Sequence, residues 1–413
     1  MLAKLKRSRV GRKLMLAGTS LLSAVNNVLP KREDKILLYE AGRTQLEDNT
    51  EALYRWLVKE GYAATYRITC CVPNDSREGN EGYKPVGAFR GVLEYLTSRY
   101  VFFAFGDFRI APSKGQVVVN LWHGTPVKAI GKMTGYRRYT EERLDNFSWV
   151  CATSENVAPV MARAFGCSPE KVRIVGQPRT DYFFNLSPNA LERLGIDRER
   201  YRKVILWMPT FRASKQEGFF DGDTALSEVP LPIVKTSEQL EELNRTAEDL
   251  GILVLIKPHP VADINCKSLS SIKCLWNRDL SAAGVALYEF VRDCDALITD
   301  YSSIYCDYLL LDRPICFTVD DLNQYSATRG FSFGDVTSLM PGPHVSGLDG
   351  LIAFLDELAS GIDRYSKDRH RVNEFFNSGV TRNNCEVLAS MCGLSSSANR
   401  ATFESSDNRR ETQ

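Results

Sequence analysis

The stretch Val117–Pro126, VVVNLWHGTP, shows the pattern on which the fold assignment depends. A short apolar run rich in β-branched residues ends there in a polar motif with glycine and proline. Comparable apolar runs recur along the chain, and segments with helical character lie between them. Near-continuous apolar strands that alternate with helices are typical of parallel sheets covered on both faces. The sequence therefore predicts an α/β fold.

The apolar runs form two series. The first comprises residues 35–40, 66–72, 100–106, 117–122, 149–153 and 172–176, and the second comprises residues 204–209, 252–257, 272–277, 296–299 and 314–319. Helical patterns cover residues 50–60, 155–165, 238–250 and 283–293. Two series predict two Rossmann-like doubly wound domains, an N-terminal one at 31–190 and a C-terminal one at 191–365. We expect helices at 366–392, and a tail at 393–413 that is too polar to order itself.

Composition and charge exclude several classes of protein. At about 150 residues per domain, the 413 residues suggest two or three domains. The chain carries 52 Lys and Arg against 51 Asp and Glu, a balance that argues against a nucleic-acid partner. The eleven cysteines are scattered and show no CxxC spacing. They are typical of buried thiols in the cytoplasm rather than of a disulfide framework or a zinc site.

Residues 1–30 combine a basic start with a weakly apolar segment. Six basic residues and no acid lie in the first thirteen positions, and the apolar stretch 14–29 is too short to span a membrane. Three interpretations remain open: an amphipathic helix on an anionic membrane surface, a signal peptide or an ordinary solvated helix. A clear cleavage site is missing before Pro30. We therefore favour peripheral association with the cytoplasmic face of the cell membrane.

Five predicted strands end in unusual polar motifs. These are HGTP (123–126), GQPRTD (176–181), PTFR (209–212), KPHP (257–260) and DYSS (300–303). In open parallel sheets, ligands bind in the crevice beyond the carboxyl ends of the strands. Two motifs belong to the first predicted domain and three to the second, so we expect the site in an interdomain cleft.

The residue types in these motifs indicate phosphate chemistry. His123 and His259 are two of only four histidines, and imidazole can take a proton from an alcohol near neutral pH. Arginine and lysine, here Arg179, Arg212 and Lys257, are the usual phosphate partners. Hydroxyls before a helix, as in DYSS, can add an anion site.

Cofactor chemistry is not indicated. The chain has no Walker loop and no GxGxxG motif, so neither P-loop hydrolysis nor a dinucleotide cofactor is predicted. No metal constellation such as HExxH occurs, although Asp300 and Asp307 could bind a cation. Each motif also has an ordinary interpretation. Arg179 and Asp181 could form a surface ion pair, and DYSS could simply cap the next helix.

Taken together, the motifs resemble those of one known family. The matching segments are LWHGTPVKAIGK (121–132), VGQPRTDYFF (175–184), ILWMPTFR (205–212), IKPHP (256–260), ITDYSSIYCDYLLLDRPICF (298–317), RGFSF (329–333) and PGP (341–343). They are similar to those of the CDP-glycerol glycerophosphotransferases, the teichoic-acid primases and polymerases of bacterial cell walls. The resemblance covers about residues 35–380. It implies a GT-B-like fold and a peripheral membrane protein.

The resemblance also implies a reaction. Glycerol phosphate would pass from CDP-glycerol to a hydroxyl of a polyprenyl-linked or polymeric glycan acceptor, and CMP would leave. This would serve teichoic-acid or capsular polymer synthesis, and no cofactor is expected. The transferred group could instead be ribitol phosphate from CDP-ribitol. Two further alternatives are a GT-B glycosyltransferase that uses a nucleotide sugar and a non-catalytic scaffold for envelope assembly.

Site residues carry over from the family motifs position by position. His123 is implied as the general base, and His259 as a second catalytic residue that neutralises phosphate charge. The implied substrate-binding residues are Trp122, Gly124, Thr125 and Pro126 for donor or acceptor, Arg179, Pro209, Thr210, Lys257 and Pro258 for the cytidine diphosphate, Ser302 and Ser303 for the pyrophosphate, and Asp307 for the nucleotide.

Overall fold

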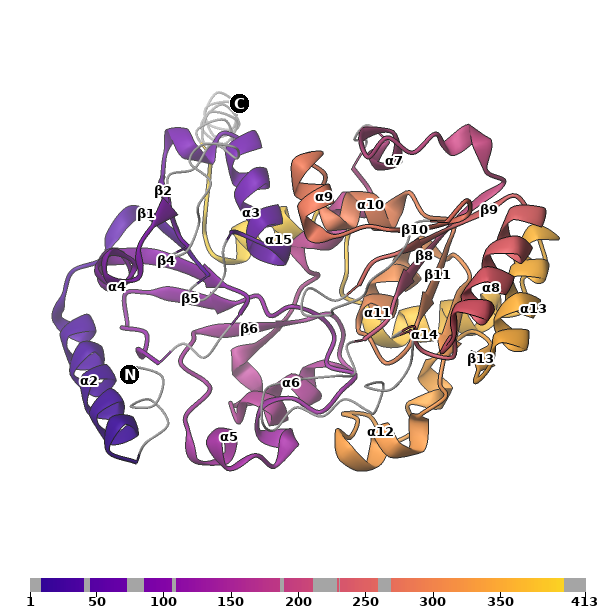
Figure 1. The fold of residues 1–413 in the computed structure, drawn as a ribbon. Coiled ribbons are helices and arrows are strands. Elements are labelled where there is room, and N and C mark those ends of the chain that lie inside the picture. The colour runs from indigo at the N-terminus through magenta and orange to yellow at the C-terminus, as the bar shows by residue number, and fades with distance from the viewer. Residues whose placement is uncertain are drawn as a thin grey trace, which may run out of the picture. The chain divides into compact units, whose positions relative to one another are not determined.

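The part of the chain described by the computed structural model builds two parallel β-sheets, one of seven and one of six strands (Figure 1). The structure describes residues 9–40, 45–72, 85–105, 109–185, 189–210, 229, 231–258 and 269–396. The chain divides into two units. Unit 1 comprises Met1–His123, Gly135–Asp181 and Gly379–Gln413, and unit 2 comprises Gly124–Thr134 and Tyr182–Ser378. This division differs from the predicted ranges 31–190 and 191–365, because unit 2 takes a short segment after His123 and unit 1 takes the C-terminal end.

The sheet of unit 1 has the strand order β3-β2-β1-β4-β5-β6-β7, and all neighbouring strands are parallel. Its strands are β1 (Arg32–Tyr39), β2 (Arg67–Cys71), β3 (Pro85–Val86), β4 (Ser98–Phe103), β5 (Val117–Asn120), β6 (Trp149–Ala152) and β7 (Val172–Ile174). The order reverses between β1 and β4. In a doubly wound sheet, this reversal opens a crevice beyond the carboxyl ends of those two strands.

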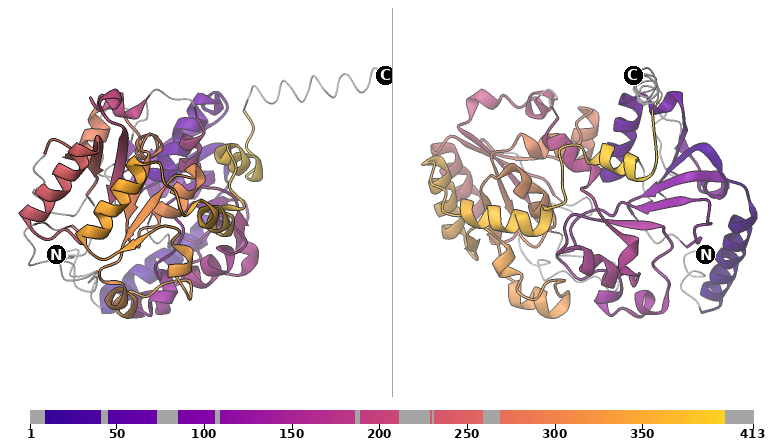
Figure 2. Two further views of the ribbon diagram at one scale, coloured as in Figure 1. Left: turned by 90° about the vertical axis from the view of Figure 1, so that its right-hand side faces the viewer. Right: turned by 180° about the vertical axis from the view of Figure 1, so that it is seen from behind.

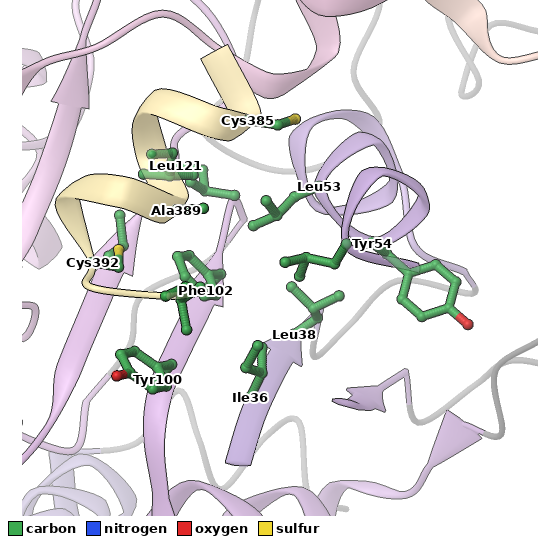
Figure 3. Packing of buried hydrophobic residues seen from close by; sticks show 14 of the residues in the cluster. Ile36, Leu38, Leu53, Tyr54, Tyr100, Phe102, Leu121, Cys385, Ala389 and Cys392 are labelled. Carbon is green, nitrogen blue, oxygen red and sulfur yellow. The ribbon is translucent and has the colours of Figure 1, made fainter. Parts of the chain in front are cut away.

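Helices from both ends of the chain pack in unit 1. They are α2 (Arg9–Val28), α3 (Asp48–Lys59), α4 (Ala88–Thr97), α5 (Arg137–Glu141), α6 (Ala158–Phe165) and α15 (Asn384–Met391). Figure 3 shows α3 and α15 over one face of the sheet, with Leu53, Ala389 and Cys392 against side chains of β1 and β4. The last helix therefore completes the core of the unit that the first strand begins.

The sheet of unit 2 has the order β10-β9-β8-β11-β12-β13, again parallel throughout. Its strands are β8 (Lys203–Met208), β9 (Ile252–Ile256), β10 (Ile272–Cys274), β11 (Ala296–Thr299), β12 (Ile315–Thr318) and β13 (His344–Val345). The reversal lies between β8 and β11. Its helices are α7 (Ala190–Arg193), α8 (Ser237–Asp249), α9 (Asn277–Ala282), α10 (Leu287–Arg292), α11 (Ile304–Tyr308), α12 (Leu322–Thr328), α13 (Leu348–Ala359) and α14 (Ser366–Asn377). One core cluster joins α8 and α13 to the central strands.

The eleven predicted strands all occur, within a few residues of their predicted bounds. The two-residue strands β3 and β13 were not predicted, because a pair of residues carries no periodicity. The predicted helix at 283–293 exists as α10, but its predicted start is wrong, because α10 begins at Leu287. Gly284 adopts a left-handed φ of 63°, which glycine tolerates and a helix interior does not. The chain therefore turns between α9 and α10.

The C-terminal helices belong to different units. The helices α13 and α14 are part of unit 2, whereas α15 is part of unit 1 and lies beside α3 (Figure 2). Gly379 begins the return to unit 1, and its N–H donates to Thr153 O over 2.9 Å. A Cβ at this position would lie 2.2 Å from Ile174 Cγ2, so only glycine fits there.

Two further predictions can be compared with the structure. Within the described ranges, no helix is long and apolar enough to cross a membrane. Nine described cysteines take part in no disulfide, and most of these are buried, as predicted. Cys274 is an exception, because it is disulfide-bonded. The polar tail 397–413 lies outside the described residues.

Candidate active site

The carboxyl edge of the unit 1 sheet carries His123. Strand β4 ends at Phe103, next to the point where the strand order reverses, and β5 ends at Asn120. The imidazole Nδ1 of His123 lies 2.9 Å from the carbonyl oxygen of Ala104, the residue after β4. A carbonyl can only accept, so Nδ1 carries the proton and the lone pair of the neutral ring is on Nε2. This is the tautomer in which Nε2 can act as a base.

Two aromatic rings fix the plane of the imidazole. The ring centroid of Phe105 lies 4.5 Å from that of His123 with an interplanar angle of 14°, and that of Trp122 lies 4.0 Å away at 35°. Together with the bond to Ala104, these contacts restrict both rotation and tilt of the ring. A base held in this way loses little freedom when the substrate binds.

Trp122 has an unusual backbone. Its φ is 57°, in the left-handed region that bulky residues rarely adopt. The side-chain amide of Asn49 donates to the carbonyl oxygen of Trp122 over 2.8 Å. Strained backbones persist only where the surroundings fix them, and they cluster at functional sites. Asn49 therefore holds the strained residue that directs His123.

Asn49 also connects this loop to the GQPR loop after β7. Its side-chain amide donates to Gln177 Oε1 over 3.1 Å, and its Oδ1 accepts from the backbone N–H of Arg179 over 3.1 Å. Asn49 is fully buried. One side chain at the start of α3 thus fixes both site loops of unit 1, and we call these contacts the Asn49 clamp.

Arg179 is buried and binds an acid that the sequence did not reveal. Its Nη1 lies 2.6 Å from each carboxylate oxygen of Asp48, and the residue is only 3% exposed. The alternative of an Arg179–Asp181 ion pair is wrong. Asp181 instead accepts from the backbone N–H groups of Asn384 and Cys385, at 2.7 and 2.9 Å, and so caps α15. Burial raises the pKa of Asp181, and these hydrogen bonds offset only part of that shift.

The rest of the HGTP motif belongs to unit 2. Residues 124–134 pair there with a loop after α12, since Lys128 and Phe331 form an antiparallel bridge and Ser332 N donates to Val127 O. Gly124 has a φ of 137°, which favours glycine. The buried hydroxyl of Thr125 has no hydrogen-bond partner among the described residues. An unsatisfied buried hydroxyl is costly. Pro126 is also buried.

In unit 2, the reversal between β8 and β11 brings together Thr210 and Asp300. The backbone N–H of Thr210 lies 3.1 and 2.9 Å from the two carboxylate oxygens of Asp300, and its hydroxyl donates to Oδ2 over 2.6 Å. Asp300 is fully buried. Pro209, half-buried, precedes this contact. The carboxylate of Asp300 thus fixes Thr210. No group of three or more potential metal ligands occurs in the described part of the chain.

Of the KPHP motif, the structure describes only Lys257 and Pro258. Lys257 is buried, and its ammonium donates to Asn277 Oδ1, at the start of α9, over 2.6 Å. Pro258 is buried beside it. The other predicted catalytic residue, His259, lies outside the described residues, as does Arg212. Their predicted roles therefore stay predictions.

The DYSS motif leads into the short helix α11. Ser302 and Ser303 are half-buried before its first turn. Ser303 occupies the N-cap position but makes no side-chain capping bond there, so the interpretation of DYSS as a simple cap finds no support. Asp307 lies within α11, is buried, and accepts from the hydroxyl of Tyr288 over 2.5 Å.

Sequence reasoning missed the residues at the start of α3. Asp48 and Asn49 belong to no recognisable motif, although they come shortly after a predicted strand. Glu40, directly after β1, is also buried and accepts from the hydroxyl of Thr50 over 2.7 Å. Polar residues after β1 could have been selected by the same rule that selected His123, because all carboxyl ends of a parallel sheet share one edge.

Comparison with known proteins identifies a family. Residues 21–388 match the family described as CDP-glycerol:poly(glycerophosphate) glycerophosphotransferase. The teichoic acid poly(ribitol-phosphate) polymerase of Bacillus spizizenii is 28% identical over 354 residues, which are 81% of this chain and 52% of the polymerase. The teichoic acid ribitol-phosphate primase of the same organism is 24% identical over 87% of this chain and 90% of the primase. The chain therefore spans about half the length of the polymerase but nearly all of the primase.

The chain is also similar to a relative that is named for glycerol phosphate. The teichoic acid glycerol-phosphate primase of Bacillus subtilis is 28% identical over 48% of this chain and 46% of the primase. Among solved structures, the wall teichoic acid polymerase TagF superimposes with a TM-score of 0.69 at 20% identity, over 92% of this chain and 95% of that one. This likeness confirms the predicted fold class, a GT-B-like α/β fold with two Rossmann-like domains.

Proposed function

Because the chain belongs to the CDP-glycerol:poly(glycerophosphate) glycerophosphotransferase family, we propose that it transfers glycerol phosphate from CDP-glycerol to an acceptor hydroxyl. The observation that carries this proposal is the imidazole of His123, whose Nδ1 contacts Ala104 O at the edge where parallel sheets bind ligands. A neutral imidazole in this tautomer is the group that an attacking alcohol requires.

The proposed step is a displacement at phosphorus. The acceptor oxygen attacks the phosphorus that bears the glycerol, the bond from this phosphorus to the CMP oxygen breaks, and CMP leaves. Nε2 of His123 takes the proton of the attacking hydroxyl. General base catalysis typically contributes about 10²–10⁴-fold, and positioning and electrostatics supply most of the remaining acceleration in phosphoryl transfer.

The donor is assigned to unit 2 by family position. Pro209, Thr210, Lys257 and Pro258 would hold the cytidine diphosphate, with Arg179 of unit 1, and Ser302 and Ser303 would hold the pyrophosphate. Asp307 would contact the nucleotide, and His259 would neutralise phosphate charge. Trp122, Gly124, Thr125 and Pro126 would contact donor or acceptor.

Ribitol phosphate is a second candidate for the transferred group. One relative, a ribitol-phosphate primase, is matched over 90% of its length. The motifs of unit 2 are directed at the cytidine diphosphate, which both donors share. The family match favours either polyol phosphate over a nucleotide sugar. The acceptor would be a polyprenyl-linked or polymeric glycan of teichoic-acid or capsular polymer synthesis.

Attachment to the cytoplasmic face of the membrane is a further part of the proposal, and α2 supports it. This helix buries Asn26, and it leaves Leu21 and Val28 67% and 81% exposed. A surface helix of a soluble protein normally turns its apolar face inward. The reversed orientation suits a helix whose apolar side lies in a lipid interface.

The proposal is tested by product analysis. The purified protein is incubated with a lipid-linked disaccharide and, in separate reactions, CDP-glycerol, CDP-ribitol or a UDP-sugar, and products are identified by mass spectrometry. We expect release of CMP and an acceptor heavier by one glycerol phosphate. Transfer from CDP-ribitol alone would select the second candidate. Consumption of the UDP-sugar without CMP release from either CDP-polyol would contradict both.

A further inference from the structure

The RGFSF loop (329–333) follows α12 in unit 2, and the proposed function gives it no role. This loop forms three hydrogen bonds to the segment that follows the HGTP motif. They are Ala129 N to Gly330 O over 3.1 Å, Ser332 N to Val127 O over 2.8 Å and Ser332 Oγ to Lys128 O over 2.8 Å. Ser332 is buried. We call these three contacts the RGFSF clasp.

Gly330 has the backbone conformation that the clasp requires. It comes directly after the end of α12, where its N–H donates to Tyr325 O over 3.3 Å, and its φ is 73°. This left-handed conformation costs free energy for a residue with a side chain and is readily adopted by glycine. The turn after α12 thus presents the carbonyl of Gly330 to the N–H of Ala129.

The same loop also contacts the DYSS motif. The ring centroid of Phe331 lies 5.5 Å from that of Tyr301 and 5.7 Å from that of Tyr325, and the two tyrosine centroids lie 4.4 Å apart. Both tyrosines are buried, and the hydroxyl of Tyr301 donates to Asp321 Oδ1 over 3.0 Å. Aromatic pairs of this kind stabilise a structure beyond the area that they bury. Phe331 therefore packs against the residue that directly precedes Ser302.

The HGTP motif is held at two different places. His123 is fixed within unit 1, by the carbonyl oxygen of Ala104 and the ring of Phe105. Residues 124–134 belong to unit 2, where the RGFSF clasp holds them. Only residues 124–126 separate His123 from the first residue of the clasp. The clasp therefore acts on the Gly-Thr-Pro part of the motif, and the imidazole depends on unit 1.

We propose that Gly330 and Ser332 are positioning residues for donor binding, which fix residues 124–126 to the same loop that contacts DYSS. The inference rests on the proposed function, in which unit 2 holds the CDP-polyol and the DYSS serines hold its pyrophosphate. It also decides between the two substrates that the family motif leaves open for Thr125 and Pro126. A segment fixed to the loop that supports the pyrophosphate site serves the donor.

Gly330→Ala is the most direct test, because it strains the clasp without removing a side chain. The nearest atom to a Cβ at this position would be Ala129 Cβ, 3.9 Å away, so the left-handed φ is the source of the strain. We expect the KM and the dissociation constant for CDP-glycerol to rise about ten-fold as the turn relaxes, with kcat nearly unchanged. CMP release gives KM and kcat, and a calorimetric titration gives the dissociation constant.

Gly361→Ala is the matched control. Gly361 also follows a helix of unit 2, α13, with a φ of 71°, and its N–H donates to Leu358 O over 3.2 Å. A Cβ there would meet no atom within 4 Å. Both substitutions should lower the thermal midpoint by similar amounts, because both strain a turn at the end of a helix. Only Gly330→Ala should raise the KM for CDP-glycerol.

Ser332→Ala tests the clasp by a second route. It removes the hydroxyl that donates to Lys128 O and keeps the backbone bond to Val127, and the KM for CDP-glycerol should rise about five-fold. Ser98→Ala is its control. The buried hydroxyl of Ser98 donates to Glu94 O over 2.7 Å at the amino end of β4, so this variant loses the same kind of bond away from the catalytic edge.

The outcomes distinguish the clasp from the proposed function. Donor KM values of Gly330→Ala and Ser332→Ala equal to those of their controls would overturn the inference. A fall in kcat at constant KM, or a rise in the KM for the acceptor alone, would overturn it as well. The proposed function would stand in these cases, since the unaltered protein would still release CMP. Failure of the unaltered protein to bind CDP-glycerol or CDP-ribitol would contradict the proposed function and the donor role of the clasp together.

Discussion

The two sheets hold their polar edges in different ways. In unit 1, the Asn49 clamp acts on the backbone of the loops that carry site residues, at Trp122 O and Arg179 N. In unit 2, the predicted binding residues are themselves held by their side chains, as with Thr210 on Asp300 and Lys257 on Asn277. In the proposed mechanism, the first arrangement would orient the base, and the second would position the residues proposed to bind the donor. We therefore expect changes at His123 and Asn49 to lower turnover, and a change at Thr210 to weaken donor binding.

The largest effect is expected at His123. His123→Ala removes the proposed base, so turnover should fall about 10²–10⁴-fold in an assay of CMP release. His370→Ala is the matched control, because that histidine lies exposed on α14, where its Nδ1 lies 2.8 Å from Ser366 O and its Nε2 lies 3.5 Å from Asp312 Oδ2. If His123→Ala turned over at a rate close to that of the control, His123 would not be the general base.

A smaller loss of turnover is expected when the side chain that forms the Asn49 clamp is removed. Asn49→Ala removes the donor to Trp122 O, so the strained backbone can relax and His123 can leave its position. Misplacement of a reacting group by about 1 Å can cost about 10²-fold, and we expect a loss of that order in kcat. The KM for the donor should also rise, but by less, because Asn49 also holds the backbone of Arg179. Asn373→Ala on α14 is the control. An increase in KM with unchanged kcat would place Asn49 in substrate binding instead.

A change at the proposed donor site of unit 2 is expected to raise the KM for the donor. Thr210→Val removes the hydroxyl that donates to Asp300 and leaves a buried carboxylate with one hydrogen bond fewer. The loop then holds the donor less well, and the KM for CDP-glycerol should rise about ten-fold while kcat changes little. Thr328→Val, at an exposed position of α12, should match the unaltered protein. If kcat fell and KM stayed constant, the assignment of unit 2 to donor binding would be wrong.

The smallest effect concerns the acid stability of unit 2. The hydrogen bond from the buried guanidinium of Arg369 lowers the pKa of Asp363. The folded chain therefore binds this proton less tightly than the unfolded chain, and the contribution to stability is present at neutral pH and lost as the pH falls below about 4. Asp363→Asn should lower the thermal midpoint at pH 7 and lower it by less at pH 3. An equal shift at both pH values would show that the charge is not the cause.

The sequence predicted the strands and most of the edge residues for one physical reason. Buried parallel strands are short apolar runs, and the residues after them share one edge, so His123 and Thr210 could be placed without a structure. The clamp could not be predicted, because Asn49 and Gln177 lie 128 positions apart and only strand pairing brings them together. The Arg179–Asp181 pair was a wrong alternative because both lie in a 3-10 helix, η4 (Pro178–Phe183). Residues two apart in such a helix point in different directions.

The division of labour between the two edges is tested most directly by a calorimetric titration of the His123→Ala protein with CDP-glycerol. If unit 1 supplies the base and unit 2 holds the donor, the dissociation constant will equal that of the unaltered protein although CMP release is lost. Loss of CDP-glycerol binding together with turnover would contradict this account, because His123 would then be part of the donor site.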